Sequence, residues 1–540
     1  MSGLSELTAA WAYKVFFALI NSIFAVYNYF IPRLTVSEPK DPILFLSAKR
    51  LIEKLKAKEV SLTAPSYIKS VDVIKAYIKR IEEVNDVINA AVFKNYEKAL
   101  ELAQKCDEEL ENVEANSEEM DQIYASKPLF GLPYTVKDMF EIEGVNVTCG
   151  IVARKGIVSK KTAPCLQNLH NAGAILLATT NVPEACVWME SANMVYGTTN
   201  NPYDSRRIAG GSSGGEAALL AAAGSLIGVG SDIGGSIRVP ATFNGVFGLK
   251  TSQGLVNGEG GVPEKMCEGG LREELACVGP LCRYAEDLPL MVQAMAPEAY
   301  KDMKVDEPLD LQDLHVYYIP RLDGYNKEPV DSEILKRIYE AVHFLEDQGM
   351  KSERVKFPEM DDSLKMWLAA MDAPGHPSLT THVTNPKTAF NLFTEVLKSV
   401  FRKSDHTVAL LLAVLTEVYP PFDDREREQL LADLRALRSR VQKLLSNNAV
   451  LVFPGWHIPA PYHNQPLFFP NSIPYTSIWN CMGTPTVAVP LGLNREGLPI
   501  GCQVIGGPMS ERVLITVAQK LERKMDLAEG WILTGLSALA

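Results

Sequence analysis

The chain of 540 residues is predicted to adopt an α/β fold, because strand-like and helix-like segments alternate along it. Residues 129–139 and 175–180 are short apolar runs typical of buried strands, and helical segments separate them. Hydrophobic residues make up 47% of the chain and charged residues 22%, which is ordinary for a packed globular protein. Together these features favour a sheet with mixed or parallel strands.

The first 40 residues differ in composition from the rest of the chain. Residues 15–31 contain no charged side chain, and Pro32 and Arg33 end this apolar run. Its seventeen residues are at the short limit of a membrane span. Aromatic residues near its ends suit a membrane interface: Trp11, Tyr13, Tyr27 and Tyr29. We therefore expect residues 1–40 to form a single-pass membrane anchor. The alternatives are an amphipathic helix that lies on a membrane or is docked on the following domain.

The charges that flank this segment predict an intracellular catalytic domain. Lys14 precedes the segment, and four basic residues follow it: Arg33, Lys40, Lys49 and Arg50. An excess of Lys and Arg marks the cytosolic side of a membrane helix. A cleaved signal peptide fits less well, because no cleavage site of small residues follows and the start of the chain is not basic.

From residue 41 onward the sequence has the pattern of one large domain. Residues 71–89 carry apolar side chains at helical spacing, which predicts an amphipathic helix packed against a core. Strands are predicted at 449–454, 486–490 and 499–505, and a closing helix at 511–522. Neither a repeat nor a linker interrupts this region, so residues 41–540 are expected to form a single catalytic domain.

The composition also argues against several classes of function. A net charge of −12 is unlike that of a protein with a nucleic-acid-binding surface. The nine cysteines are scattered without a C-x-x-C pair, which indicates reduced thiols and neither a disulfide framework nor a zinc site. The eight histidines include no H-E-x-x-H motif, so we expect no metal and no cofactor.

Two glycine-flanked serines and one lysine are the candidate catalytic residues. The turns Gly210-Gly211-Ser212 and Gly234-Gly235-Ser236 are 24 positions apart. Glycine permits positive φ angles and close approach of other atoms, so both serines can reach one pocket. Lys137 lies in the apolar run 129–139, and a buried neutral lysine can act as a general base. This combination, with no histidine nearby, suits acyl transfer by a nucleophile and a base.

Each of these residues also has a plainer interpretation. Lys137 could instead pair with Asp138 or Asp232, and the two serines could be ordinary turn hydroxyls. The nucleophile elbow of α/β-hydrolases needs a glycine two residues after the serine, which is absent after Ser236. A phosphate-binding loop also fits poorly, because no G-K-[ST] follows and Glu216 would repel phosphate.

Three motifs taken together resemble the amidase signature family: V-K-D at 136–138, G-G-S-S-G-G-E at 210–216 and D-I-G-G-S-I-R-x-P-A at 232–241. The resemblance runs from about residue 51 to residue 522 and is densest between 129 and 251. It implies a large twisted mixed β-sheet covered by helices on both faces, here preceded by an N-terminal hydrophobic helix. The apolar N-terminus and the 75-residue spacing between Lys137 and Ser212 look most like those of fatty acid amide hydrolases.

The resemblance implies a catalytic role for each of the three candidate residues. Ser236 would be the acyl nucleophile, Ser212 the bridging serine and Lys137 the base of a Ser-Ser-Lys triad. The peptide bond that leads into Ser212 is usually cis in this family. The family's oxyanion hole corresponds to four peptide N–H groups, those of Ile233, Gly234, Gly235 and Ser236.

Residues around the triad are also given expected roles by the resemblance. Cys186 stands where fatty acid amide hydrolases have a methionine, so only its backbone could take over that substrate contact. Ser213 is expected to be a supporting hydrogen-bond donor, and Arg238 to brace the loop through a carboxylate. Ser231 stands where a threonine is common.

The activity implied by the resemblance is hydrolysis of long-chain primary amides and N-acylethanolamines, through an acyl-enzyme, to fatty acid and amine. Alternatives within the family are an amidase of small amides and a transamidosome amidase subunit, which do not normally carry an N-terminal anchor. An alternative of a different class is an inactive scaffold with the amidase fold. The presence of Lys137, Ser212 and Ser236 together disfavours that scaffold.

The segment 390–401 is expected to contact a membrane near the entrance for the acyl chain. Its apolar residues are Phe390, Leu392, Phe393, Val396, Leu397, Val400 and Phe401. Lys398, Arg402 and Lys403 could meet anionic headgroups there. The alternative is that these helices pack in the core or in a homodimer contact. The expected partners are therefore a lipid amide substrate and a membrane, and no nucleic acid.

Overall fold

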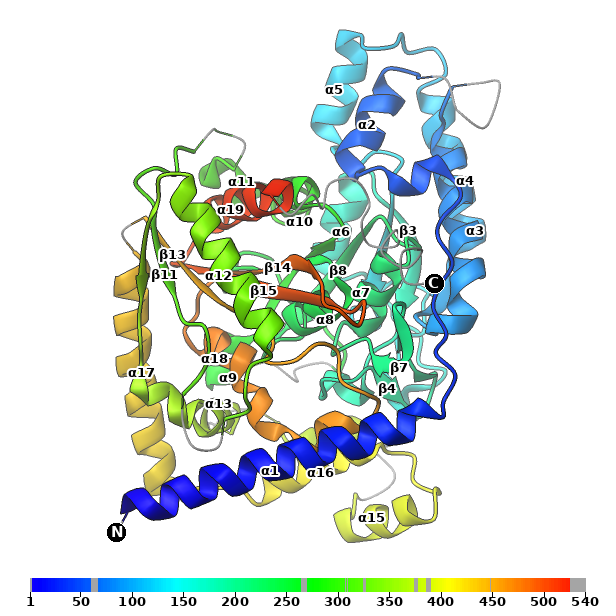
Figure 1. The fold of residues 1–540 in the computed structure, drawn as a ribbon. Coiled ribbons are helices and arrows are strands. Elements are labelled where there is room, and N and C mark those ends of the chain that lie inside the picture. The colour runs from blue at the N-terminus through cyan, green and yellow to red at the C-terminus, as the bar shows by residue number, and fades with distance from the viewer. Residues whose placement is uncertain are drawn as a thin grey trace.

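The computed structural model describes residues 2–524 apart from 60–66, 264–269, 306, 308, 324–326, 373–376, 385–389 and 447. An 11-stranded sheet runs through its centre, in the order β1-β3-β2-β8-β10-β9-β14-β15-β13-β11-β12 (Figure 1). Strand β2 is parallel to β3 and β8, and β11 is parallel to β12 and β13. The remaining neighbours are antiparallel, so the sheet is mixed, as predicted.

The strands of the large sheet are β1 (Ala91–Lys94), β2 (Pro133–Lys137), β3 (Ile175–Thr180), β8 (Ile227–Asp232), β9 (Phe247–Lys250), β10 (Cys277–Cys282), β11 (His315–Tyr318), β12 (Lys351–Arg354), β13 (Ala449–Pro454), β14 (Thr486–Leu493) and β15 (Pro499–Gly506). Two small hairpins lie outside it: β4 (Ala192–Asn193) with β5 (Gly197–Thr198), and β6 (Asn200–Asn201) with β7 (Asp204–Ile208).

The helices of the first half of the chain are α1 (Ser2–Tyr29), α2 (Ala48–Lys56), α3 (Ser70–Ile88), α4 (Tyr96–Glu109), α5 (Glu118–Ser126), α6 (Pro164–Asn171), α7 (Gly214–Ala221), α8 (Arg238–Asn244) and α9 (Gly270–Leu275). Those of the second half are α10 (Leu288–Met295), α11 (Pro297–Met303), α12 (Ser332–Asp347), α13 (Ser363–Met371), α14 (Leu379–Val383), α15 (Leu392–Val400), α16 (Val408–Val418), α17 (Asp424–Leu445), α18 (Pro474–Cys481) and α19 (Glu511–Lys524).

Helices cover both faces of the sheet, and strand β13 shows why. Successive side chains of a strand point to opposite faces. Val450 and Val452 belong to the hydrophobic core that contains α12 and α19, whereas Leu451 and Phe453 belong to the core of α13, α17 and α18. Every residue of β13 is buried, so the strand is apolar throughout instead of alternating. This confirms the predicted sheet with helices on both sides.

Most predicted elements agree with the structure to within a few residues. Helix α3 covers the predicted 71–89, and β3 occupies 175–180 as predicted. The strand expected at 129–139 is shorter: β2 begins only at Pro133, because Gly131 sits in a turn with φ 77°.

The single-pass anchor expected at the N-terminus is not supported. Within the described residues, no helix is long and apolar enough to cross a membrane. Helix α1 lies along one side of the catalytic body instead (Figure 1). Its Phe17 and Ile20 are buried against Phe469, and the Phe17 and Phe469 ring centroids are 4.7 Å apart.

Polar contacts hold α1 to the body at three further points. The Tyr13 hydroxyl donates to Glu328 Oε1 (2.8 Å), Gln465 Nε2 donates to Asn21 Oδ1 (2.7 Å), and Arg206 Nη1 donates to the Asn28 carbonyl (3.1 Å). Asn21, a polar residue inside the apolar run, thus uses its side chain to dock the helix. The docked-helix alternative therefore describes α1 better than a membrane span does.

Candidate active site

Lys137 ends strand β2, where its amine lies beside two serine hydroxyls. Its Nζ is 2.6 Å from Ser212 Oγ and 2.9 Å from Ser231 Oγ. Ser231 lies on β8, the parallel neighbour of β2, and Ser212 lies in the turn before α7. The Gly211–Ser212 peptide bond is cis, as the resemblance implied. The side chain of Lys137 is only 1% exposed, so its amine is almost entirely withdrawn from water.

The alternative in which Lys137 is an ion-pair partner of Asp138 or Asp232 is wrong. Asp138 Oδ2 accepts a hydrogen bond from the Thr148 hydroxyl (2.9 Å), and Asp232 is paired with Arg238. Among the ion pairs of the described residues, none includes Lys137. A buried amine whose contacts are hydroxyls is in the position that a general base for Ser212 would occupy.

Asp232 and Arg238 fix the loop that carries Ser236. Both side chains are fully buried, and the guanidinium donates through Nε (3.0 Å) and Nη2 (2.9 Å) to the two carboxylate oxygens. The same carboxylate accepts the N–H groups of Gly235 (2.7 Å) and Ile237 (3.0 Å). A buried carboxylate must be paired and hydrogen-bonded to be tolerated, and this one is. The predicted bracing role of Arg238 is therefore confirmed.

The expected oxyanion hole of four donors needs one correction. Gly235 N–H donates to Asp232 Oδ1, because the buried carboxylate needs that donor. Within the described part of the chain, no acceptor pairs with the N–H groups of Ile233, Gly234 and Ser236. Three of the four N–H groups that were expected to form the oxyanion hole therefore have no acceptor among the described residues.

Two side chains from distant parts of the sequence orient these peptide groups. Thr476 Oγ1 donates to the Gly234 carbonyl (2.6 Å), and Trp367 Nε1 donates to the Ile233 carbonyl (3.1 Å). Each bond fixes the orientation of one carbonyl of the loop and uses none of its N–H groups. Neither residue could be predicted from the sequence, since nothing local marks them as neighbours of a loop more than 130 positions away.

Ser236 and Ser213 join the two glycine turns through the backbone. Ser213 N–H donates to the Ser236 carbonyl (3.0 Å). The Ser236 hydroxyl makes no hydrogen bond to another described residue, so a direct bond from it to Ser212 is not present. The Ser213 hydroxyl is buried and likewise has no partner in the described chain, so the expected donor role of this side chain is not seen.

Cys186 ends a one-turn 3-10 helix, Glu184–Cys186, beside the Lys137–Ser212 contact. Its thiol lies near Ser212 and is 3.4 Å from the thiol of Cys149. Burial raises the pKa of this thiol, but the hydrogen bond with Cys149, together with the amine of Lys137 when that amine is protonated, lowers it to about 7. The sequence placed Cys186 near the site but gave no sign of Cys149.

Glu216, on α7, is a fully buried carboxyl that lies against β2 and β3. It accepts hydrogen bonds from the hydroxyls of Thr135 (2.7 Å) and Thr180 (2.8 Å). Burial raises its pKa to about 8, and the two hydrogen bonds only partly offset that. Near neutral pH it is therefore mostly protonated and places little negative charge near Lys137.

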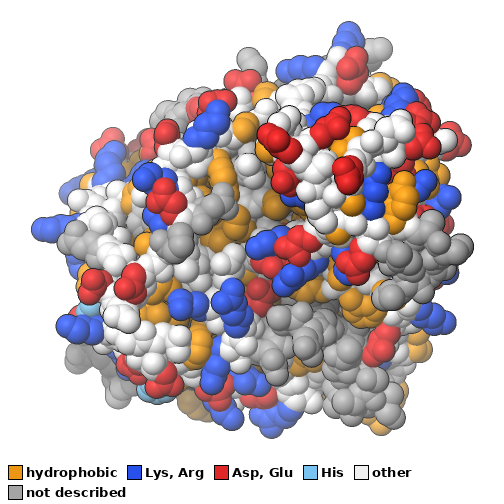
Figure 2. Space-filling view, turned by 90° about the horizontal axis from the view of Figure 1, so that it is seen from above, with side chains coloured by type: hydrophobic (Ala, Val, Ile, Leu, Met, Phe, Trp, Pro, Cys, Tyr) orange, Lys and Arg blue, Asp and Glu red, His pale blue; other side chains and the backbone are white. Residues whose placement is uncertain are grey.

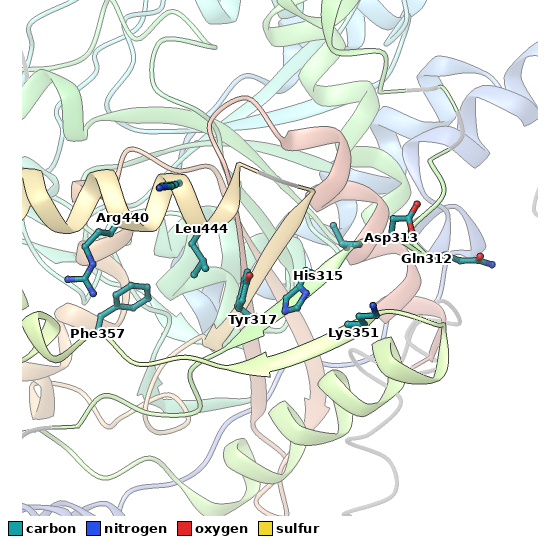
Figure 3. Close-up of a pocket in the computed structure, with 10 residues that line it drawn as sticks. Gln312, Asp313, His315, Tyr317, Lys351, Phe357, Arg440 and Leu444 are labelled. Atoms are coloured by element: carbon teal, nitrogen blue, oxygen red, sulfur yellow. The ribbon is translucent and has the colours of Figure 1, made fainter.

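A cavity of about 690 Å³ lies elsewhere, between β11, β12 and α17 (Figure 3). Its lining includes His315, Tyr317, Lys351, Phe357 and Arg440. None of the residues that line it belongs to the Lys137–Ser212–Ser236 region. This cavity is therefore not part of the candidate active site, which is defined by the hydrogen bonds described above.

The fold and this constellation define an enzyme that hydrolyses amides. The Amidase family matches residues 72–515, and the chain belongs to that amidase signature family. This confirms the membership expected from the three sequence motifs.

Among named relatives, Fatty-acid amide hydrolase 2-A of Danio rerio is 36% identical over 537 residues, covering 95% of this chain and 95% of that protein. Fatty-acid amide hydrolase 2 of Homo sapiens is 36% identical over 519 residues, covering 93% of each. The predicted resemblance to fatty acid amide hydrolases, and to fatty acid amide hydrolase 2 in particular, is confirmed. A solved structure of a fatty acid amide hydrolase has a TM-score of 0.69 at 23% identity, covering 91% of this chain and 86% of that one.

Proposed function

We propose that the protein hydrolyses long-chain fatty acid amides, both primary amides and N-acylethanolamines, to fatty acid and amine. The observation that carries this proposal is the 2.6 Å contact between Lys137 Nζ and Ser212 Oγ, in a buried site where no carboxylate of the described residues pairs with the amine. Relatives named as fatty-acid amide hydrolases match nearly the whole chain at 36% identity, which supports the substrate class.

The reaction proceeds through a proton relay. Neutral Lys137 takes a proton from Ser212 as Ser212 takes one from Ser236, whose oxygen attacks the amide carbonyl. Negative charge then develops next to the three free N–H groups of the Ser236 loop, and each such donor is worth about 3 kcal/mol. The proton returns through Ser212 to the leaving amine, and water hydrolyses the acyl-enzyme through the same relay.

The relay requires Ser236 to come within hydrogen-bonding distance of Ser212 when substrate is bound. The backbone bond between Ser213 and Ser236 keeps the two turns adjacent. Catalytic hydrogen bonds that are long without substrate often shorten in the substrate complex. The Ser236 hydroxyl has no hydrogen-bond partner among the described residues, so it is free to rotate toward Ser212.

Ser236→Ala is expected to abolish acyl-enzyme formation, and labelling of a different serine by a fluorophosphonate would contradict its role as nucleophile. Lys137→Ala is expected to slow hydrolysis by about 10²–10⁴-fold. The loss should be larger for an oleoyl amide than for the matching methyl ester, because the amine must be protonated to leave. The exposed Lys49→Ala serves as the control. Equal losses on amide and ester would exclude the relay.

The substrate class is tested by offering oleoyl, arachidonoyl and short-chain amides side by side and measuring the released amine. Long-chain amides should have the higher kcat/KM. Higher values for short amides would favour the small-amide alternative. The chain is also similar to a Glutamyl-tRNA(Gln) amidotransferase component of Carboxydothermus hydrogenoformans, at 28% identity over 501 residues. Activity of the isolated chain on lipid amides distinguishes the proposed enzyme both from such a component and from an inactive scaffold.

We further infer that the protein takes its substrate from a membrane surface, on which α1, α15 and α16 lie. These helices are at the same end of the molecule (Figure 1). Phe393 is 79% exposed, Val400 72% and Trp11 68%. On α16 the exposed apolar residues follow helical spacing: Val408, Leu412, Leu415 and Val418. By contrast, Figure 2 shows Lys and Arg interspersed with Asp and Glu on the opposite face.

Only part of the segment predicted to face a membrane is free to do so. Phe390 and Leu392 are partly buried and pack against the core, so they are removed from the predicted face. The exposed members are Phe393, Val396, Leu397, Val400 and Phe401. Exposed apolar side chains along a helix, as on α15, are typical of helices that lie in a membrane interface.

Flotation with liposomes tests the surface. The double variant Phe393→Glu, Phe401→Glu is expected to float less than the wild type, and a chain that lacks residues 1–33 is expected to float least. The matched control is Tyr339→Glu, an exposed aromatic residue of α12, away from these helices. Unchanged flotation of both altered chains would refute the membrane contact. A change from dimer to monomer in the double variant would assign the surface to a homodimer.

A further inference from the structure

The two thiols of Cys149 and Cys186 lie side by side next to the Lys137–Ser212 contact. Their sulfur atoms are 3.4 Å apart, although the residues are 37 positions apart in the sequence. Of the eight cysteines that the structure describes, no other two are in hydrogen-bonding contact. A disulfide has a sulfur–sulfur bond of about 2.05 Å, so the sulfur atoms need to approach by only about 1.3 Å.

The backbone already holds the two segments together. Ala185 N–H donates to the Cys149 carbonyl (2.9 Å), which joins the turn before Cys186 to the turn that contains Cys149. Cys149 (φ 52°), Ala185 (φ 54°) and Cys186 (φ 59°) all have left-handed backbone conformations, which residues other than glycine adopt rarely. Such conformations persist where the surroundings enforce them. Both thiols are therefore carried by fixed turns.

The two thiols differ in environment in the way that oxidation to a disulfide requires. Cys186 is partly exposed, whereas Cys149 is buried. The hydrogen bond from Cys149 favours the thiolate of Cys186, and the amine of Lys137 favours it further whenever that amine is protonated. The pKa of the Cys149 thiol is raised by burial, so this residue stays protonated until its neighbour has reacted. An accessible thiolate beside a second thiol is the arrangement found in peroxide-sensitive proteins.

We propose that Cys149 and Cys186 are a peroxide-oxidisable thiol pair whose disulfide switches off the adjacent catalytic site. The thiolate of Cys186 attacks the peroxide oxygen, which gives a sulfenic acid and, after protonation, water. The thiol of Cys149 then displaces a second water as the sulfur–sulfur bond forms. Overall two thiols lose two electrons and two protons, and one hydrogen peroxide becomes two waters.

Disulfide formation would act on catalysis through the contacts of Cys186. The thiol of Cys186 is within reach of Ser212, and Asp138, the neighbour of Lys137, is bonded to Thr148, the neighbour of Cys149. A displacement of about 1 Å at a catalytic group can reduce the rate about 10²-fold. The reduced enzyme should therefore lose about 10- to 100-fold in kcat/KM on oxidation and regain it with dithiothreitol. This part of the proposal rests on the proposed amide hydrolysis.

The site itself is tested without any activity measurement. The full-length reduced protein is treated with hydrogen peroxide, free thiols are blocked with N-ethylmaleimide, and peptides are mapped by mass spectrometry without reduction. The expected result is a peptide pair joined through Cys149 and Cys186, with Cys106, a partly exposed cysteine outside the site, still blocked by maleimide. Peptides of Cys149 and Cys186 that both remain free would overturn the proposal.

Activity is then measured on the same samples. Cys149→Ser is expected to keep its basal amide hydrolysis within about twofold of the wild type and to lose reversible inhibition by peroxide. Cys149→Ala is the second variant, should the serine be poorly tolerated at this buried position. A mapped disulfide with unchanged hydrolysis would overturn the switch. If the reduced protein cleaves no amide at all, the proposed function fails, while the peptide map still decides whether the thiol pair is oxidised.

Discussion

The wild-type protein is expected to lose stability as the pH rises because of Glu216, and Glu216→Gln is expected to remove this loss. The carboxyl is fully buried between the hydroxyls of Thr135 and Thr180, and its pKa rises from 4.5 to about 8. Because the folded-state pKa is above the unfolded value, its contribution to stability is complete below pH 4.5. It is lost as the pH rises through about 8.

The size of the effect follows from the pKa difference. Each pKa unit corresponds to about 1.4 kcal/mol, so a rise from 4.5 to about 8 corresponds to about 5 kcal/mol. Globular proteins unfold with about 2.1 cal/mol/K of entropy per residue, which for 540 residues is about 1.1 kcal/mol/K. The melting temperature of the wild type should therefore fall by about 4 °C relative to the variant between pH 5 and pH 9.

Glutamine keeps the shape and the hydrogen bonds of the site. Its oxygen accepts from Thr180, and its amide can donate to Thr135. The Thr135 hydroxyl then turns toward Ser225, whose oxygen is already 2.8 Å away. Burial also raises the pKa of Asp287, Glu328 and Glu522 to about 7, but these groups are present in both proteins and cancel in the comparison.

The assay is thermal unfolding of the wild type and Glu216→Gln at each pH from 5 to 9, with the exposed Glu428→Gln as a control. The difference in melting temperature between wild type and Glu216→Gln should be smallest at pH 5 and grow through pH 8. If the difference in melting temperature between the two proteins were the same at every pH in this range, the assignment of a neutral carboxyl to Glu216 would be refuted.

Two further substitutions probe the loop that carries Ser236. Gly235→Ala places a Cβ against the Thr476 hydroxyl at φ 130°, so it should lower the free energy of unfolding by about 1–3 kcal/mol. Gly254→Ala, also at positive φ but in open space, is the control, and an equal loss there would remove the steric explanation. Arg238→Met leaves the Asp232 charge buried without its cation and should cost about 3–5 kcal/mol in urea unfolding. Adding Asp232→Asn should recover part of that loss, and no recovery would mean that the charge is not the cause.

The parts of the site that the sequence predicted are those that depend on local residue type. Glycines beside Ser212 and Ser236 mark turns wherever they occur, and the apolar residues on either side of Lys137 predict a buried strand end. Arg238 was predicted to brace the loop through a carboxylate, and the structure shows that this carboxylate is Asp232, six positions before it. Asn480, which donates to the same carboxylate from α18, has no local signature and was missed.

The N-terminal helix shows the complementary limit. An uncharged run of seventeen residues is compatible with a membrane span, a surface helix or a docked helix, and composition alone does not distinguish them. The distinction depends on which residues contact α1 in the folded chain. Phe17 packs against Phe469, more than 450 positions away, and Asn21 accepts a hydrogen bond from Gln465. Such contacts are properties of the folded chain and not of any segment within it.

The number of free N–H groups at the Ser236 loop follows from the same long-range contacts. Each non-proline residue of a loop offers one peptide N–H group as a hydrogen-bond donor. The resemblance alone assigned four of these N–H groups to the oxyanion hole. In the folded chain the buried Asp232 carboxylate takes the donor of Gly235, while Thr476 and Trp367 each engage a carbonyl and no N–H. A buried carboxylate is costly unless it is hydrogen-bonded, so one placed closer to the loop would accept a second N–H group as well. Arg238 and Asn480 hold the Asp232 carboxylate in place, and its position therefore decides which N–H group of this loop is engaged.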